Sequence, residues 1–417
     1  MRVLLIAANT ERISMVTLPY GLGLVAAALR QAGHAVAFLD LLEAGDLGTS
    51  IPQAIRGSAP EVIGLSIRNI DDQNRQEPHF LLEKAREVVA ACRAASQAPI
   101  VLGGPGYSIF PRETLAYLKA DYGIRGDGEA AFPALLERLR CRRDPGDIPG
   151  VQVAGGSGAT TCAAAADLDQ FPLWDDALDR PADRASPEFW VPVQSRRGCP
   201  NDCSYCSTAR IQGRAYRCRS PRQVVDAVAA LARRGYRRFY FVDNSFNLPE
   251  TQALALCRGL RTLAPAVQWR CILYPQGVSE DLVRAMAASG CVEASLGFES
   301  GSPAILREMN KRFSPGEVRR LSDLLAAHGI RRMGFLLLGG PGETRATVEE
   351  SLAFARSLQL DGLRTTVGIR IYPGTALARR AVREGVITGE EDLLFPRFYL
   401  APGLEPWLQA RVATADG

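Results

Sequence analysis

Short apolar runs alternate with longer amphipathic stretches along the first 143 residues. The runs have the length and β-branched composition of buried strands, whereas the longer stretches repeat their apolar positions with a helical period. This alternation predicts a parallel sheet with helices on both faces, because parallel neighbours need a crossover connection. The expected strands cover residues 3–7, 35–42, 62–67, 99–102 and 122–124, with helices at 22–32 and 81–94.

A second alternating series begins at Phe189, after a stretch rich in proline, aspartate and alanine between residues 144 and 188. Such a composition is typical of a linker. The series predicts six β/α units, enough for an open partial barrel. Its expected strands lie at residues 190–195, 238–242, 269–273, 294–298, 334–338 and 365–371.

The fold class predicted is therefore α/β, with two domains. Residues 1–143 form a Rossmann-like, doubly wound parallel sheet, 144–188 a linker, and 189–384 a partial (β/α)6 barrel. Residues 385–417 form a short C-terminal segment with aromatic and proline anchors and no cysteine.

Composition narrows the class of protein. The formal charge is only +4 over 417 residues, and Lys84, Lys119 and Lys311 are the only lysines among many arginines. This skew gives no sign of a nucleic-acid footprint. No apolar run approaches the 18 or so residues that span a bilayer. We therefore expect a cytoplasmic protein without a membrane or nucleic-acid partner, whose ten cysteines serve metal binding or catalysis before disulfides.

Three cysteines, Cys199, Cys203 and Cys206, stand at a C-x3-C-x2-C spacing in a loop just after the first barrel strand. Three thiolates can ligate three irons of a cubane cluster and leave the fourth iron open. Zinc is the alternative, but a structural zinc site needs four ligands. The nearest further cysteine is Cys218, and no histidine is close.

Polar and glycine-rich segments follow three later strands. Residues 241–245 end the second barrel strand, 297–300 the fourth, and 339–343 the fifth. Glycine-rich strand ends are common turns, so each segment alone indicates little. Their order behind the cysteine motif makes them a candidate binding site at one edge of the sheet.

The cysteine spacing, the aromatic Tyr205 and the strand-end segments resemble the radical S-adenosylmethionine (SAM) superfamily. The resemblance implies a 4Fe–4S cluster on the three cysteines, with SAM bound to its open iron. Reductive cleavage of SAM would then give a 5'-deoxyadenosyl radical, and an electron donor such as flavodoxin or ferredoxin would be a partner. The SAM-binding residues that it implies are Tyr205, Asp243, Asn244, Ser295, Glu299, Gly339 and Gly340.

The N-terminal domain resembles the cobalamin (B12)-binding domain that precedes the barrel in one radical SAM subfamily, which includes methyltransferases. The Asp-x-His-x-x-Gly motif that supplies a lower histidine ligand is absent, so Arg68 or Asn69 is expected beneath the corrin. A relic domain without corrinoid is the alternative. The cobalamin-binding residues implied are Tyr20, Ser66, Arg68, Asn69, Gly103, Gly104, Pro105, Gly106, Gly126 and Glu129.

Together these resemblances imply methylation of an unactivated carbon of a small biosynthetic intermediate through methylcobalamin and a 5'-deoxyadenosyl radical. Oxidative cyclisation, ring rearrangement or dehydrogenation without methyl transfer is an alternative, because the same two domains serve both. A non-catalytic corrinoid or iron–sulfur sensor is another. Methylthiolation of RNA or protein would need three more cluster cysteines in the N-terminal domain, which has only Cys92 and Cys141.

Other residues keep two interpretations at this point. Lys311 follows the fourth barrel strand and is either functional or ordinary surface. Seven arginines between 196 and 222 could act on the cluster, on SAM or on a phosphorylated substrate, or could form a solvated face. Of the scattered cysteines, Cys271 is the one expected to face the barrel cavity.

Overall fold

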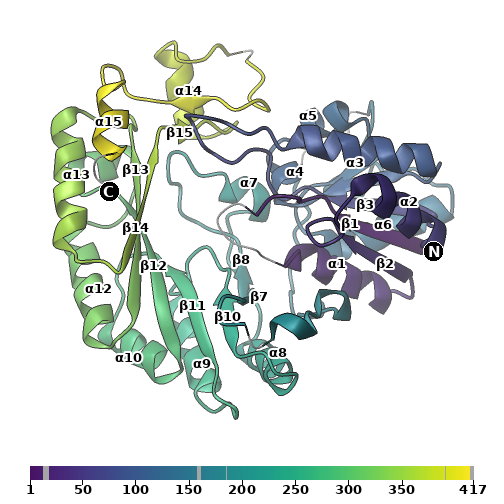
Figure 1. The fold of residues 1–417 in the computed structure, drawn as a ribbon, viewed down its shortest axis with the longest axis horizontal. Coiled ribbons are helices and arrows are strands. Elements are labelled where there is room, and N and C mark those ends of the chain that lie inside the picture. Colours follow the sequence, from purple (N-terminus) through teal and green to yellow (C-terminus); the bar gives the residue numbers. More distant parts are fainter. Residues whose placement is uncertain (13–17, 157–160, 185, 390, 414–417) are drawn as a thin grey trace. The chain divides into compact units, whose positions relative to one another are not determined.

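The computed structural model describes residues 1–12, 18–156, 161–184, 186–389 and 391–413. It divides into two compact units (Figure 1). The first unit comprises Met1–Asp72, Pro78–Pro181 and Ser207–Arg217, and the second comprises Gln73–Glu77, Ala182–Cys206 and Cys218–Gly417. Two short segments, Gln73–Glu77 and Ser207–Arg217, thus pack with the unit that does not flank them in sequence.

The first unit is built on a six-stranded sheet with the order β2-β1-β3-β4-β5-β6. Five strands are parallel, as predicted, and β6 is an antiparallel edge strand beside β5. Its three residues lie in the stretch that the sequence pattern assigns to the linker. The strands are β1 (Arg2–Ala7), β2 (Ala35–Asp40), β3 (Val62–Ser66), β4 (Ile100–Gly103), β5 (Tyr122–Ile124) and β6 (Val151–Val153).

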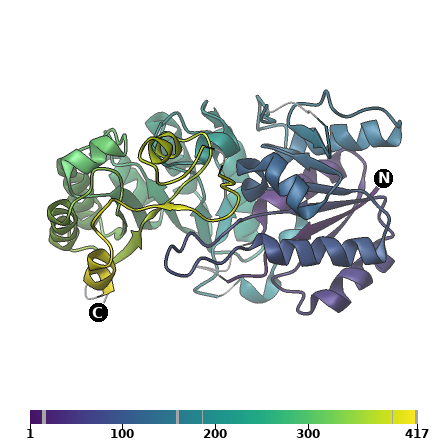
Figure 2. The same ribbon diagram turned by 90° about the horizontal axis from the view of Figure 1, so that it is seen from above.

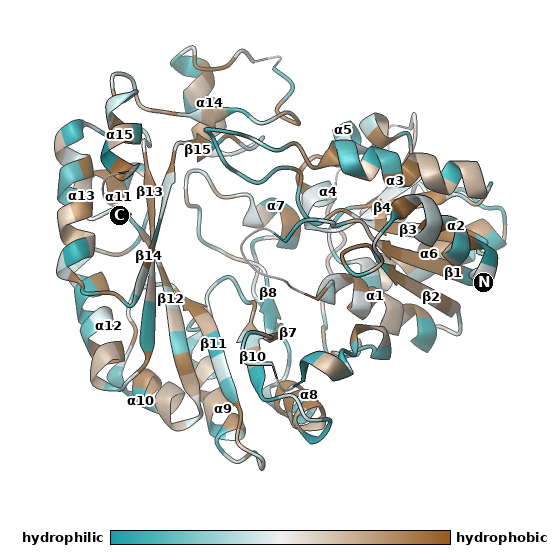
Figure 3. Ribbon diagram, in the orientation of Figure 1, coloured by the Kyte–Doolittle hydropathy of each residue, from teal (hydrophilic) through white to brown (hydrophobic). Residues whose placement is uncertain are grey.

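Helices cover both faces of this sheet (Figure 2). Successive strand residues point to opposite faces, so every second residue of β1 joins one helical layer. Val3 and Leu5 pack with residues of α1 and α6, which contact each other, while α2, α3 and α5 form a second group. Figure 3 shows the strands as largely hydrophobic, as burial of a parallel sheet on both faces requires. The helices are α1 (Tyr20–Gln31), α2 (Leu47–Ser58), α3 (Leu82–Ala95), α4 (Pro105–Ile109), α5 (Pro111–Leu118) and α6 (Gly128–Arg140).

The second unit contains the six parallel strands of the expected partial barrel, in the order β14-β13-β12-β11-β10-β7. A small antiparallel pair, β15 (Ile369–Arg370) with β16 (Phe398–Tyr399), follows the last barrel strand. The predicted α/β class with a doubly wound sheet and a partial barrel is confirmed. The barrel strands are β7 (Val191–Val193), β10 (Arg238–Phe241), β11 (Gln268–Leu273), β12 (Cys291–Glu299), β13 (Arg331–Leu338) and β14 (Gly362–Val367).

Helices connect the barrel strands and pack against their outer face. Each β/α unit repeats because a parallel strand must be followed by a crossover. Among the described residues, no helix is long and apolar enough to cross a membrane. The connecting helices are α8 (Pro221–Arg233), α9 (Glu250–Leu260), α10 (Glu280–Ala288), α11 (Pro303–Glu308), α12 (Pro315–Ala327) and α13 (Arg345–Ser357). Two further helices, α14 (Ala376–Arg383) and α15 (Trp407–Ala413), follow the last barrel strand.

Cys271 does not face the barrel cavity, and that prediction is wrong. It is buried on β11 with the alternate residues Trp269 and Leu273, so the strand period places it on the helix-covered face. Burial raises the pKa of its thiol well above the usual value, and the thiols of Cys291 and Cys257 lie near it. Cys271 therefore behaves as a core residue.

Candidate functional site

The three motif cysteines lie in the loop between β8 (Arg196–Arg197) and α7 (Thr208–Gln212). Cys199 and Cys203 are half-buried, Cys206 is exposed, and none is in a disulfide. Burial raises the pKa of Cys199 and of Cys203, and the negative charge of a Cys206 thiolate raises both further. Within the described ranges no three His, Cys, Asp or Glu side chains converge on one ion. A cubane takes each thiolate on a different iron, so this donor set fits the predicted cluster.

Arg196 and Asp243 hold the backbone that leads into the cysteine loop. Arg196 is only 2% exposed, and its guanidinium donates to the Gly198 carbonyl at 3.1 Å and to Ser245 Oγ at 2.8 Å. The Asp243 carboxylate accepts from Ser195 Oγ at 2.5 Å and from the Arg196 amide at 3.1 Å. Burial raises the pKa of Asp243, while Arg196 and these hydrogen bonds lower it. The contacts fix the residues immediately before Cys199.

This use of Asp243 differs from the SAM contact implied by the resemblance, which stays a prediction. Asp243 follows the second barrel strand where the motif places it, but its oxygens accept hydrogen bonds from the amides of Ser195 and Arg196 and from the Ser195 hydroxyl. Asn244, the next residue, is half-buried at the same strand end. The solvated face considered for the arginine cluster is contradicted for Arg196, Arg197 and Arg219, which are buried.

A buried ion pair lies beside the cysteine loop. Lys311 has a side chain only 5% exposed, and its Nζ lies 3.2 Å from Glu299 Oε1. The same oxygen accepts from the Tyr205 hydroxyl at 3.0 Å. The Lys311 ammonium also lies over the rings of Tyr205, Tyr274 and Phe313, at 5.4, 5.9 and 5.8 Å from their centroids. Lys311 is therefore not ordinary surface.

Electrostatics keep this lysine charged. Burial opposes its charge, but Tyr205, Glu299 and Cys203 outweigh burial and raise the pKa of Lys311 well above its usual value. Burial, followed by the charge of Glu299, raises the pKa of Tyr205, so that hydroxyl stays protonated. The group provides a fixed cation and a hydrogen-bonded carboxylate next to a candidate iron ligand.

The backbone at Glu299 is held in an unusual conformation. Glu299 ends β12 with φ of 64°, and the pairing of β12 with β13 shifts register between Leu296 and Glu299. A left-handed residue other than glycine costs on the order of 1–3 kcal/mol and is concentrated at functional sites. A Cβ at Gly297 would lie 3.1 Å from Glu299 Oε1, so glycine leaves room for the carboxylate. Ser295 is half-buried and lies two residues before Gly297 on β12, so the strand period places both residues on the same face of the sheet.

The end of β13 is a glycine turn bound by Glu343. The amides of Gly339 and Gly340 both donate to Glu343 Oε2, the second at 2.9 Å. Burial raises the pKa of Glu343 to about 7, although these two hydrogen bonds lower it. Within the described residues Oε1 has no hydrogen-bond partner. Glu343 thus sets the shape of the segment implied to bind SAM.

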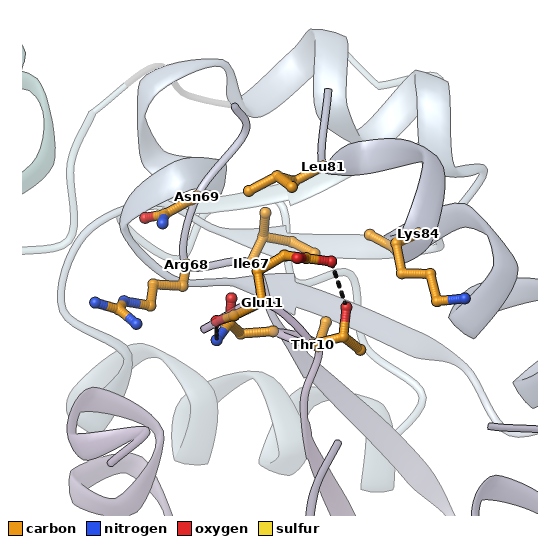
Figure 4. Close-up of a pocket in the computed structure, with 10 residues that line it drawn as sticks. Thr10, Glu11, Ile67, Arg68, Asn69, Leu81 and Lys84 are labelled. Atoms are coloured by element: carbon orange, nitrogen blue, oxygen red, sulfur yellow. Dashed lines mark hydrogen bonds between the residues drawn. The ribbon is translucent and has the colours of Figure 1, made fainter. Parts of the chain in front are cut away.

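In the first unit, a pocket lies at the carboxyl ends of β1 and β3 (Figure 4). Ligands of open parallel sheets bind at this edge, so the position fits a cobalamin. Arg68 and Asn69, both implied as cobalamin contacts, line it. Burial lowers the pKa of Arg68. The remaining lining residues are Ala8, Asn9, Thr10, Glu11, Ile67, Leu81, Lys84 and Ala85.

The glycines after β4 serve the protein backbone. Gly104 has φ of 96°, and a Cβ there would lie 2.6 Å from the Ile67 carbonyl oxygen and 3.0 Å from Ser66 Oγ. The Gly106 amide donates to the same carbonyl at 3.0 Å, and the Ile67 amide donates to Gly103 at 2.8 Å. Pro105 begins α4 between these contacts. The segment therefore supports the strand end that carries Arg68.

Two of the remaining implied cobalamin residues, Gly126 and Tyr20, contact the stretch that follows β6. Gly126 has φ of 93°, and a Cβ there would collide with the Ala163 carbonyl. The Tyr20 hydroxyl donates to the Leu173 carbonyl at 3.2 Å. Glu129 is buried in the first turn of α6. Their contact with a corrinoid stays a prediction.

Sequence reasoning missed several residues of these sites. Arg196 and Glu343 form hydrogen bonds with backbone groups of nearby residues, and the sequence does not indicate which groups these are. Thr10 and Lys84 could have been found, because Thr10 follows the first strand and Lys84 is one of only three lysines.

Comparisons with known proteins match both parts of the chain. The model of the radical SAM superfamily matches residues 193–355, and that of the B12-binding domain matches residues 7–136. This chain therefore belongs to the radical SAM enzymes that carry a B12-binding domain. The cofactor classes that these two domains hold are the predicted ones, a 4Fe–4S cluster with SAM and a cobalamin.

Relatives extend over most of the chain. An uncharacterized methyltransferase of Pyrococcus horikoshii is 24% identical over 93% of this chain and 84% of its own length. The tryptophan 2-C-methyltransferase of Streptomyces laurentii is 25% identical over 89% of this chain and 73% of its own. The structure of the radical SAM methyltransferase TsrM from Kitasatospora setae, with tryptophan and a SAM analogue bound, has a TM-score of 0.87 at 23% identity. It covers 100% of this chain and 88% of that one, which establishes the shared fold.

Proposed function

We propose that this protein is a cobalamin-dependent methyltransferase that methylates a carbon of a small biosynthetic intermediate. The supporting observation is that relatives named as methyltransferases align with both domains of the chain. When bound, SAM and the cluster supply a radical that removes a hydrogen atom from the substrate, and cobalamin supplies the methyl group.

In this proposal Cys199, Cys203 and Cys206 ligate the cluster, and the chain's other residues bind and orient. Lys311 and Glu299 present a cation and a carboxylate beside Cys203, which suits the carboxylate and ammonium of a bound amino acid moiety. Glu343 keeps the amides of Gly339 and Gly340 fixed at the next strand end. In the first unit, Arg68 and Asn69 are the proposed contacts of the corrin.

The test is anaerobic reconstitution with iron, sulfide and hydroxocobalamin, followed by reduction and addition of methyl-labelled SAM. We expect label on the protein-bound corrinoid, with S-adenosylhomocysteine as the product. Adding a panel of small aromatic and phosphonate acceptors should then give labelled product together with 5'-deoxyadenosine and methionine.

A Cys203→Ala variant is the matched control, because it removes one iron ligand of the radical step. The proposal fails if SAM is cleaved to 5'-deoxyadenosine while the corrinoid stays unlabelled. That result would indicate oxidative cyclisation, rearrangement or dehydrogenation instead. A reduced protein that binds both cofactors and leaves SAM intact would be a sensor.

A further inference from the structure

Helix α14 packs directly on the cysteine loop. The Leu377 amide, in its first turn, donates to the Ser204 carbonyl at 2.8 Å. Ser204 stands between Cys203 and Cys206, and its own amide donates to the Met309 carbonyl at 3.0 Å. An ion pair between Arg380 and Glu308 also joins α14 to α11. One face of α14 thus lies one hydrogen bond away from the backbone of the candidate cluster ligands.

The opposite side of α14 exposes apolar side chains. Val382 is 43% exposed and Val386, just after the helix, is 38% exposed. With Phe395, which is 45% exposed, they make up three of the four exposed large apolar residues in the described part of the chain. Scattered single residues need no explanation, but this concentration within one short segment is typical of a contact surface.

The same surface carries positive charge. Arg379 and Arg383 lie four residues apart, both are exposed, and neither forms an ion pair within the described residues. The nearby acids Glu308 and Glu384 are both paired with Arg380. The helix therefore presents two guanidinium groups that form no ion pair within the described residues, beside apolar side chains, which is the composition of an interface with an acidic partner.

We infer that this surface, Arg379, Val382, Arg383 and Val386, is the docking site of an acidic one-electron carrier protein. The inference rests on the proposed function, because cleavage of SAM needs the cluster to receive an electron. One electron leaves the carrier, which is oxidised by one electron, and the cluster passes from its 2+ to its 1+ state. No proton or group moves in this step. The hydrogen bond from Leu377 to Ser204 provides a short covalent and hydrogen-bonded route from the docked carrier to the cluster loop.

The test measures cluster reduction itself. The reconstituted full-length protein is mixed anaerobically with a reduced acidic flavodoxin, and bleaching of the cluster absorbance is followed by stopped flow. For R379E/R383E we expect reduction to slow at least about tenfold at low salt and no longer to fall as salt is raised, since charge complementarity acts mainly on association and salt now screens a repulsion. Reduction of the same variant by dithionite, a small inorganic reductant, should stay within about twofold of the wild-type rate, because no docking is involved.

The matched control is R222E/R356E, which makes the same charge change on α8 and α13. We expect it to be reduced by flavodoxin at the wild-type rate. Wild-type-like reduction of R379E/R383E by flavodoxin overturns the inference. Equal slowing with flavodoxin and dithionite also overturns it, because the arginines would then act on the cluster. A third outcome separates the two proposals. If flavodoxin reduces the wild-type cluster normally but the corrinoid never receives label, the proposed methyl transfer is wrong and the docking site is unaffected.

Discussion

Among the described residues Glu299 is the one carboxylate paired with Lys311, and both side chains are largely out of water. Removing one member of a buried pair leaves the other charge uncompensated and costs about 3–5 kcal/mol. We therefore predict that Lys311→Met lowers the melting temperature of the anaerobic, cluster-loaded protein by about 6–12 °C. Glu299→Gln should also destabilise the protein, because it leaves the buried Lys311 ammonium without its carboxylate, although the amide oxygen can still accept from the Tyr205 hydroxyl.

The double variant K311M/E299Q separates pairing from packing. Its melting temperature should exceed that of K311M, because no unpaired carboxylate remains. Arg284→Met is the control, since Arg284 forms exposed pairs with Glu280 and Asp281 and should shift melting by less than about 2 °C. Additive effects of K311M and E299Q would contradict a direct interaction.

At the scale of residues, the sequence predicts the candidate cluster ligands better than it predicts the residues that hold the cysteine loop in place. The cysteine spacing is local, so Cys199, Cys203 and Cys206 could be proposed from the sequence. The link between Tyr205 and Glu299 spans 94 residues, and only the fold creates it. Likewise, Arg196 is one arginine among many until the structure buries it.

At the scale of elements, the strands of the first sheet were predictable because buried parallel strands give continuous apolar runs. Several barrel strands were predictable because buried apolar residues alternate along them with less buried ones. The edge strand β6 was not, because three residues carry no periodic signal and follow a glycine and proline turn. The orientation of Cys271 could have been inferred from the sequence, because polar and apolar residues alternate along β11 and Cys271 shares the face of the buried Trp269.

The turn between β13 and α13 gives a prediction about pH. Glu343 has a pKa of about 7 in the folded protein and 4.5 as its ordinary value. Between these values the folded state holds a proton that the unfolded state has lost, so stability falls as pH rises, by roughly 3 kcal/mol in total. Glu343→Gln should remove this loss, and its amide oxygen can still accept from Gly339 and Gly340.

The measurement is the free energy of unfolding of wild type and variant at pH 5 and pH 8 in denaturant. We expect the difference between the two proteins to change by roughly 3 kcal/mol across this range, in favour of the variant at pH 8. Glu350→Gln, an exposed change on the helix α13 that follows this turn, should leave the pH dependence unaltered. A variant whose pH dependence matched the wild type would show that Glu343 titrates normally.

At the scale of the whole molecule, the chain builds two units with separate cores but exchanges short segments between them. Residues Ser207–Arg217 directly follow the last motif cysteine and yet pack with the first unit. There the buried carboxylate of Asp127 accepts from Arg217, and Arg217 also donates to the Ala165 carbonyl at 3.0 Å. The sequence composition predicts a domain boundary where the alternation of strands and helices stops. It does not indicate that a later segment, Ser207–Arg217, belongs to the first unit.

Separate cores imply that the two cofactors bind independently. Every proposed cobalamin residue lies in the first unit, and within the described residues the core cluster around β1, α1 and α6 contains no side chain of the cysteine loop. The variant C199A/C203A/C206A should therefore lose the cluster absorbance and keep one cobalamin per chain, as measured by corrinoid and iron analysis. Conversely, Arg68→Ala should weaken cobalamin retention and leave four irons per chain. If either variant lost both cofactors, the units would fold as one cooperative body and the division into independent sites would be wrong.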